Sequence, residues 1–142
     1  FRSIQNPSIH SLLSSKYHEA QMHRLNIHAE IPDPVIHNYL TDLDLAVVLG
    51  HLMDNAIDGA RKASEGFISL AYFDEEDCQS FIIESTIAEE QVPLSMMSTQ
   101  LSHPEGGIGV NAVQDILERY PNTSFSVRSQ NHKMMQILEM RP

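Results

Sequence analysis

The stretch TDLDLAVVLGHLMDNAIDGARK, residues 41–62, has the most regular pattern in the sequence. Its apolar side chains recur at spacings of three and four residues, and they are Leu45, Val48, Leu49, Leu52, Met53, Ala56, Ile57 and Ala60. This spacing predicts an amphipathic helix with a wide apolar face. Such a helix is stable when that face is buried, so the rest of the chain must provide a second layer.

The sequence on both sides of this helix predicts further helices and several strands. Asn6-Pro7 is typical of a helix start, and we expect that helix to run to about Arg24. A third helix is expected after Gly109, with Pro121 at its end. Strand-like runs occupy 26–31, 67–73, 79–84, 124–130 and 134–140, with an acidic hairpin loop at 74–77. Helices and a mixed or antiparallel sheet would form two layers, an α+β sandwich.

Length, charge and cysteine content limit what the protein can be. The 142 residues suffice for one domain, and no apolar run is long enough to span a bilayer. Lys and Arg total 9 against 19 Asp and Glu, which gives a formal net charge of -10. That excess of acid argues against a nucleic-acid-binding surface, which must neutralise phosphates. Because Cys78 is the one cysteine, the chain has no internal disulfide and no multi-thiolate metal site.

The polar side of the helix predicted at 41–62 carries a candidate site. His51, Asn55 and Asp58 lie at i, i+4 and i+7 and therefore share one stripe. One interpretation is a plain solvated helix face. The other is a Mg²⁺ site, because an amide oxygen with nearby carboxylates suits a hard cation that shares phosphate ligands. Asn is also a mediocre helix former, so Ala or Lys would serve a plain surface better. The pattern alone leaves both interpretations open.

A second candidate site is the glycine-rich segment GGIGV, residues 106–110, which leads into the third helix. Glycines allow positive φ and close backbone approach, and the N–H groups of a helix start bind anions. The Rossmann and Walker phosphate-binding patterns are both absent. The preceding residues 87–105 have no convincing period and contain Pro93 and Pro104. We expect these residues to form a long mobile loop that acts as a lid.

Together, the two candidate sites resemble the motifs of one family. LGHLMDNAIDGA, residues 49–60, resembles the N box of the GHKL ATPase superfamily, which includes histidine kinases, gyrase and MutL. GGIGVNAV, residues 106–113, resembles the second glycine box of that family, and the order of the two motifs also fits. Asn6-Pro7 with LLSSKYHEA, residues 12–20, is similar to peptide-sensing, quorum-type bacterial histidine kinases, and so is ILERYPN, residues 116–122.

This resemblance implies a fold, an activity and partners. The fold would be the GHKL α/β sandwich, an α+β fold with about three helices on one face of a mixed sheet of about five strands. The domain would bind the cofactors ATP and Mg²⁺ and donate the γ-phosphoryl group to a histidine outside this chain, as the catalytic domain of a two-component sensor histidine kinase. Its partners would be its own dimerisation and phosphoacceptor domain, a response regulator and a second copy in a full-length homodimer, with no nucleic acid.

The resemblance also implies a place in a longer protein. Residues 1–24 would form a helix that links from an upstream dimerisation and phosphoacceptor domain, and residues 25–142 would form the ATP-binding catalytic domain. The chain opens on Phe1 and not on Met, which agrees with this expectation. We expect a cytoplasmic domain of a membrane-anchored sensor.

Carried over by position, the functional residues of the family fall on both motifs and on the strand before residues 87–105. Asn55 would be the Mg²⁺ ligand, with His51 as a second catalytic residue. Glu84 stands where the first glycine box places the side chain that accepts from the adenine amino group. The residues expected to contact the nucleotide are Asn55, Asp58, Glu84, Gly106, Gly107, Gly109 and Val110.

The chain departs from the family pattern at three places. ESTI, residues 84–87, replaces the Asp-x-Gly-x-Gly of the first glycine box. His51 stands where the family usually has Asn or Glu, and Asp58 where many kinases have a phosphate-contacting Lys. The altered glycine box leads to an alternative function: a degenerate GHKL domain that does not bind ATP and acts as a protein-interaction or phosphotransfer scaffold.

Overall fold

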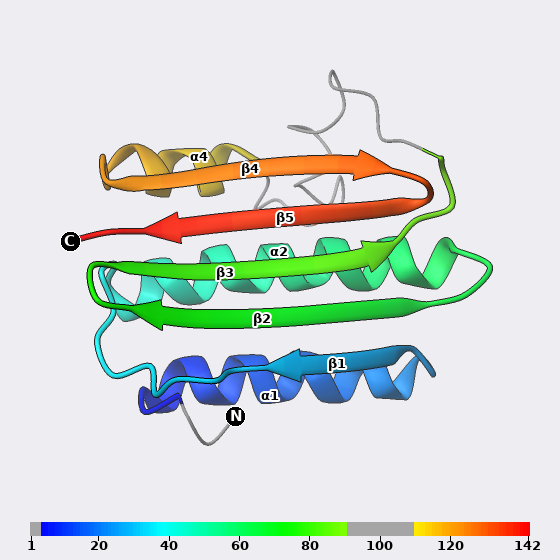
Figure 1. Ribbon diagram of the computed structural model, residues 1–142, viewed down its shortest axis with the longest axis horizontal. Coiled ribbons are helices and arrows are strands. Elements are labelled where there is room, and N and C mark those ends of the chain that lie inside the picture. The colour runs from blue at the N-terminus through cyan, green and yellow to red at the C-terminus, as the bar shows by residue number, and fades with distance from the viewer. Residues whose placement is uncertain (1–3, 91–109) are drawn as a thin grey trace.

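The computed structural model describes residues 4–90 and 110–142, with the backbone alone for residues 110–112. Its strands form a five-stranded sheet in the order β1-β2-β3-β5-β4 (Figure 1). They are β1 Asn26–Glu30, β2 Phe67–Glu75, β3 Cys78–Thr86, β4 Thr123–Gln130 and β5 Lys133–Met140. β1 runs parallel to β2, and the other neighbouring pairs are antiparallel. The mixed five-stranded sheet confirms the predicted fold class.

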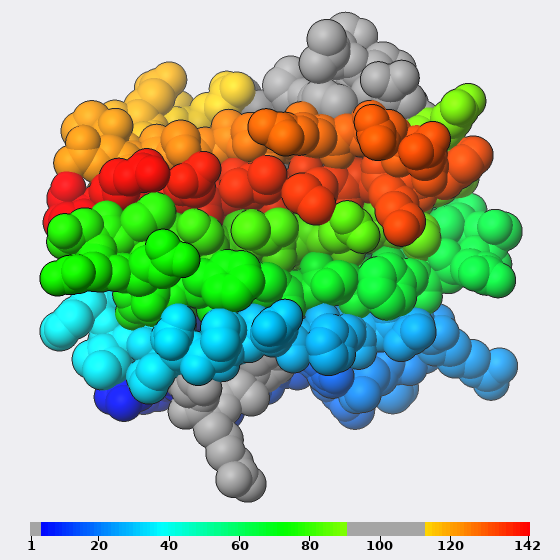
Figure 2. Space-filling view, in the orientation of Figure 1, coloured from blue at the N-terminus to red at the C-terminus, as the bar shows by residue number. Residues whose placement is uncertain are grey.

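Three helices in the described part of the chain cover one face of this sheet: α1 Pro7–Met22, α2 Asp42–Lys62 and α4 Val110–Glu118 (Figure 1). The outward side chains of the strands form the opposite face, which Figure 2 shows. This arrangement is the two-layer sandwich expected from the sequence. None of the helices that the structure describes is long and apolar enough to cross a membrane.

The two long helices begin at capping residues that the sequence supplies. The side-chain oxygen of Asn6 accepts hydrogen bonds from the N–H groups of Ser8 and Ile9 at 2.9 and 3.1 Å. Thr41 Oγ1 accepts from the N–H of Asp44 at 3.2 Å. These bonds satisfy first-turn donors that have no partner inside the helix, so the cap predicted at Asn6 is confirmed.

Helix α1 ends at Met22 and not at about Arg24. Arg24 has a φ of 60°, and its N–H donates to the Gln21 carbonyl at 2.9 Å. The N–H of Leu25 donates to the Ala20 carbonyl at 3.0 Å. This pair of bonds is a Schellman ending, whose left-handed residue is usually glycine. Because arginine occupies that position here, the sequence carries no signal for the end of the helix.

The hairpin between β2 and β3 is longer than predicted. Asp74 and Glu75 belong to β2, so Glu76 and Asp77 alone form the turn. Asp74 pairs with Gln79 across the hairpin, and the Gln79 side-chain NH₂ donates to the Asp74 carboxylate at 3.2 Å. This cross-strand pair extends the ladder into the acidic segment.

The main core lies between α2 and the sheet. α2 buries the apolar face that its spacing predicts, and Tyr72 and Phe81 of the sheet belong to the same cluster. Their rings meet edge to face with centroids 5.4 Å apart, a favoured aromatic geometry. α1 adds three fully buried side chains, which are Ile9, Leu13 and Ala20. α1 therefore belongs to the same sandwich, and its role as a link from an upstream domain stays a prediction.

The contact between α2 and the end of β3 requires a glycine. A Cβ atom on Gly59 would lie 2.9 Å from Ile87 Cγ2 and 3.3 Å from the Thr86 carbonyl oxygen. A side chain at Gly59 would therefore push the helix away from the strand. The glycine brings the second half of α2 close to the end of β3.

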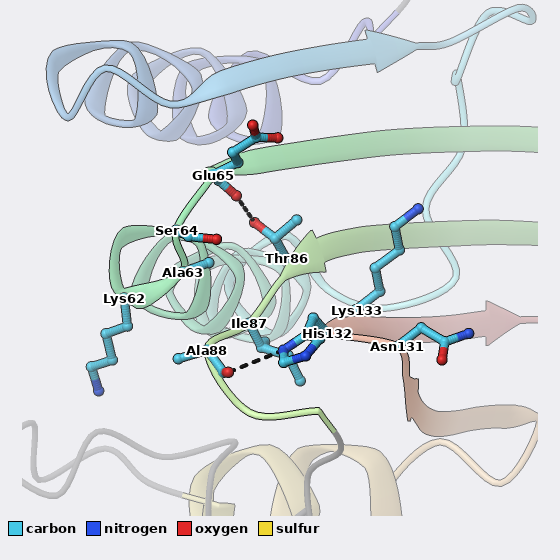
Figure 3. A pocket seen from close by; sticks show the side chains of 10 residues that line it. All are labelled: Lys62, Ala63, Ser64, Glu65, Thr86, Ile87, Ala88, Asn131, His132 and Lys133. Atoms are coloured by element: carbon cyan, nitrogen blue, oxygen red, sulfur yellow. Dashed lines mark hydrogen bonds between the residues drawn. The ribbon is translucent and has the colours of Figure 1, made fainter.

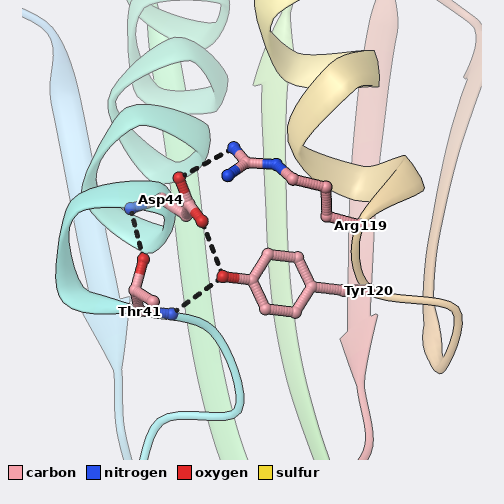
Figure 4. A network of polar contacts seen from close by, with 4 residues as sticks. All are labelled: Thr41, Asp44, Arg119 and Tyr120. Carbon is pink, nitrogen blue, oxygen red and sulfur yellow. Dashed lines mark hydrogen bonds and ion pairs between the residues drawn. The ribbon is translucent and has the colours of Figure 1, made fainter.

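A buried carboxylate joins the residues just after α4 to the start of α2 (Figure 4). Asp44 accepts a hydrogen bond from the Tyr120 hydroxyl at 2.6 Å and pairs with Arg119 at 3.1 Å. The Tyr120 hydroxyl in turn accepts from the N–H of Thr41 at 3.2 Å. The hydrogen bond from Tyr120, helped by Thr41 and Arg119 and opposed by burial, holds the pKa of Asp44 below its ordinary value.

We expect this network to make stability depend on pH. Because the pKa of Asp44 is lowered in the folded state, its contribution is complete above the unfolded-state pKa of about 4 and is lost as the pH falls through the folded-state value. Asp44→Asn should lower the free energy of unfolding by about 1–3 kcal/mol near neutral pH. The difference from wild type should shrink in acid, which urea denaturation at both pH values measures. A difference that is independent of pH would contradict the lowered pKa.

Candidate functional site

Asn55 of α2 is buried, with 8 % of its surface exposed. Its side-chain NH₂ donates to Gln136 Oε1 of β5 at 3.4 Å. A plain solvated helix face, which the sequence left open, is therefore wrong for this residue. Asn55 is instead an amide set into the interface between α2 and the sheet.

Gln136 is a fully buried residue that the sequence analysis missed. Its Nε2 donates to the backbone carbonyl of Leu52 on α2 at 3.0 Å. The other buried side chains of β5 are apolar, namely Met134, Leu138 and Met140. One polar residue in an otherwise apolar row is the signal by which Gln136 could have been found.

The other polar residues of the predicted stripe are half-buried on α2. His51 lies one turn before Asn55, and Asp58 lies one turn after it. The neighbouring Asp54 pairs with Lys16 of α1 at 2.6 Å. The described residues contain no group of three His, Cys, Asp or Glu side chains suited to a metal ion. A cation here would therefore depend on Asn55 together with oxygens of a ligand or of water.

Strand β3 presents Ser85 to α2, and not the neighbouring Glu84. Its buried side chains alternate and are Gln79, Phe81, Ile83 and Ser85. Glu84 therefore points to the opposite face, where it shares a shallow hollow with Arg128 and Met135. The structure does not bring Glu84 together with Asn55, with which the sequence analysis groups it. The two-residue period of a strand places Ser85 on the α2 side instead.

Ser85 carries a buried hydroxyl that has no hydrogen-bond partner in the described part of the chain. The residue is 1 % exposed, and its Oγ has no hydrogen bond to any described residue. This Oγ lies 3.8 Å from the position that a Cβ on Gly59 would take, so it sits beside α2. A buried polar group without a partner is costly, and native proteins keep few of them. The hydroxyl is suited to bind a polar group of a ligand.

A hollow of about 580 Å³ opens at the same end of the sheet (Figure 3). It is formed by residues 62–65 at the end of α2, residues 86–88 at the end of β3 and residues 131–133 between β4 and the start of β5. The N–H of Ile87 donates to the His132 carbonyl at 2.8 Å, and His132 Nδ1 donates to the Ala88 carbonyl at 3.1 Å. These bonds hold the chain against the turn as it leaves β3.

The remaining predicted site residues belong to the glycine-rich segment. Gly106, Gly107 and Gly109 lie outside the described residues, as does the expected lid from residue 91 onward. Val110 is the first residue of α4. The helix predicted after Gly109 is therefore confirmed, and phosphate binding by the glycines stays a prediction.

Comparison with known families matches residues 40–141 to the family described as GHKL domain. The chain belongs to the GHKL family. The match runs from the residue before the Thr41 cap of α2 to the end of β5, so it includes Asn55, Ser85 and Gln136. No curated protein matches the sequence of this GHKL domain.

Solved structures share the fold of this GHKL domain. The nucleotide-free catalytic domain of histidine kinase ThkA aligns with a TM-score of 0.74 at 13% identity, over 96% of this chain and 91% of that chain. Histidine kinase AdeS of Acinetobacter baumannii gives 0.68 at 16% identity, over 94% and 62%. ThkA in complex with the response regulator TrrA gives 0.70 at 14% identity, over 96% and 40%. The chain thus spans less than two thirds of the latter two structures. At identities this low, the structural likeness shows a common fold alone.

The unpartnered hydroxyl of Ser85 leads to a stability prediction for the domain without ligand. Ser85→Ala removes a buried group that makes no hydrogen bond to the residues the structure describes, so the free energy of unfolding should stay equal or rise by about 1 kcal/mol. Ser80→Ala, on the outward face of the same strand, is the matched control and should change it by less than about 0.5 kcal/mol. Urea denaturation without nucleotide measures both variants. A clear loss of stability in Ser85→Ala alone would mean that the hydroxyl does have a partner.

Proposed function

We propose that this GHKL domain binds Mg-ATP and donates the γ-phosphoryl group to a histidine outside the chain, as the catalytic domain of a two-component sensor histidine kinase. The observation that carries the proposal is the burial of Asn55 on α2 with its NH₂ group bound to Gln136. A buried amide is costly on a helix that needs only an apolar face, and a metal–nucleotide site gives a reason for it. The likeness to the catalytic domain of ThkA supports the same function.

The residues present fit Mg²⁺. This hard cation prefers oxygen ligands, keeps several waters, and is usually held by one or two protein groups together with phosphates. Asn55 supplies one amide oxygen, and His51 and Asp58 flank it by one turn on either side. A bound Mg²⁺ supplies charge neutralisation on the transferring phosphoryl group.

The nucleotide would be held by the end of β3 and the start of α4. Ser85 replaces Glu84 in the proposed base site, because its buried hydroxyl can donate to or accept from the edge of adenine. Gly59 keeps the space beside that hydroxyl free of a side chain. The glycines of residues 106–109 and the first N–H groups of α4, from Val110, are the proposed phosphate contacts.

The residues of this chain bind and orient, and the nucleophilic histidine lies on a separate domain. The proposed partners are the domain's own dimerisation and phosphoacceptor domain, a second copy in a homodimer, and a response regulator. The complex of ThkA with its response regulator TrrA supports the last of these. The motifs at 12–20 and 116–122 support the quorum- or peptide-sensing subgroup, with the domain on the cytoplasmic side of a membrane-anchored sensor.

Asn55→Ala tests the Mg²⁺ site. The wild type should gain more melting temperature with Mg-ATP than with ATP and a chelator, whereas the variant should gain equally with both because its oxygen ligand is gone. Without ligand the variant should lose about 1–3 kcal/mol, since Gln136 is left without its partner. Each shift is therefore measured from the variant's own ligand-free value. Asn38→Ala, in the loop before α2, is the control and should behave as wild type.

Two results would change the proposal in different ways. A wild-type domain without any shift in excess Mg-ATP would overturn it and favour a degenerate GHKL scaffold. A variant that keeps the full Mg²⁺-dependent shift would leave nucleotide binding in place and remove Asn55 from the site.

Ser85→Ala and Glu84→Ala test how the base is recognised. Ser85→Ala should weaken ATP binding about two- to tenfold, the loss of one neutral hydrogen bond, and should reduce the preference for ATP over GTP. Glu84→Ala should leave both quantities unchanged, because Glu84 faces away from α2. Competition binding with the two nucleotides measures the preference. The reverse pattern, with an effect of Glu84→Ala alone, would contradict the placement of Ser85 in the base site.

A further inference from the structure

The two ends of the Asn55 amide are chemically different. The oxygen can bind a cation, whereas the NH₂ group can only donate hydrogen bonds. The amide of a freely rotating asparagine presents either end. A Mg²⁺ site therefore needs a second group that decides which end of Asn55 faces the ligand.

The hydrogen bonds between α2 and β5 fix the orientation of the Asn55 amide. The Leu52 carbonyl is an acceptor only, so Gln136 must turn its Nε2 group toward it, and this bond is 3.0 Å long. Gln136 Oε1 then faces Asn55, where it can only accept. Asn55 must therefore turn its NH₂ group to Gln136, at 3.4 Å. The Asn55 oxygen is then the end of the amide that is not turned to Gln136, and among the described residues no hydrogen bond to it is found.

Gln136 is itself held firmly. It is fully buried, and its strand lies between β3 and β4, where Gln136 is in register with Ile83 and Val127. A residue in such a position has little freedom to move, so its side chain can act as a fixed reference for Asn55.

We propose that Gln136 is a positioning residue, which presents the oxygen of Asn55 to Mg²⁺ by binding its NH₂ group. This inference rests on the proposed Mg-ATP function. The chain from Leu52 through Gln136 to Asn55 uses the helix backbone to orient a side chain of the same helix. It also accounts for the one polar side chain in the apolar inward row of β5.

The test compares Gln136→Met with the matched control Gln79→Met. Methionine has nearly the shape of glutamine, and Gln79 is equally buried but bonds to the His37 carbonyl and to Asp74. The first measurement is the ratio of ATP affinities with and without Mg²⁺. Gln136→Met should reduce this ratio about two- to tenfold, the effect of one lost hydrogen bond, and should leave the Mg²⁺-free affinity unchanged. Gln79→Met should leave the ratio unchanged.

The second measurement needs no ligand. In NMR spectra of the wild type, the Asn55 NH₂ protons should exchange slowly with water, and they should exchange faster in Gln136→Met. Asn55→Asp in the Gln136→Met background then provides a rescue, because a carboxylate presents an oxygen in either orientation. We expect this double variant to recover the Mg²⁺ effect, as coupled residues do in a double-mutant cycle.

A further variant serves as a second test in case Gln136→Met does not fold. Gln136→Glu keeps an oxygen that accepts from the Asn55 NH₂ group, so the Mg²⁺ effect should persist. A wild type whose ATP affinity does not depend on Mg²⁺ would overturn the proposed function and this role with it. A Mg²⁺ effect that is present in wild type and complete in Gln136→Met would overturn the role of Gln136 alone. An equal reduction of the Mg²⁺ effect in Gln79→Met would also overturn it. The reduction would then be a general effect of removing a polar side chain from the core.

Discussion

Burial of the apolar face of α2 against the sheet is the interaction on which the other features depend. α1 and α4 pack against this helix, and β2 and β3 contact it from the sheet. Because strand side chains alternate, every second residue of β3 and β5 can face α2. That restriction selects Ser85 and Gln136 as the polar side chains that lie under the second half of α2, and it directs Glu84 outward.

The buried polar groups of this interface are of two kinds. Both the oxygen and the NH₂ group of the Gln136 side chain form hydrogen bonds, so its burial costs little free energy and the bonds stiffen the interface. Ser85 Oγ, like Tyr72 Oη and Gln79 Oε1, has no partner among the described residues. Burial raises the pKa of Tyr72, so this phenol stays neutral within the core. Ser85 differs from the other two in its location. It lies beside Gly59, near the point where β3 ends and the chain continues toward the glycine-rich segment.

The sequence predicts the structure well where an apolar pattern repeats many times. It predicts poorly where the identity of the site residue depends on a single position in a strand. The face of α2 repeats over 21 residues, so its bounds and its burial follow from spacing alone. Glu84 and Ser85 are adjacent, and a carboxylate is the more conspicuous candidate, so only the register of β3 separates them. Gln136 and Asn55 are 81 residues apart in the sequence, and their contact depends on how β5 lies beneath α2. No local pattern carries that information.

Asn55, the proposed Mg²⁺ ligand, is a neutral residue in a strongly acidic chain, which matters for the proposed binding of anionic ATP. The net charge of -10 repels a triphosphate at long range, and Lys16, Arg119 and Arg141 are each paired with a carboxylate. In the proposed function, a cation that arrives with the ligand and backbone N–H groups would offset this repulsion. Aspartate at this position would add a further negative charge and would set oxygen against Gln136 Oε1. Asparagine avoids both costs, because its NH₂ group donates to Gln136 Oε1 while its oxygen stays available for the proposed Mg²⁺. The hydrogen bond to Gln136 and the proposed cation thus favour the same residue type at this position.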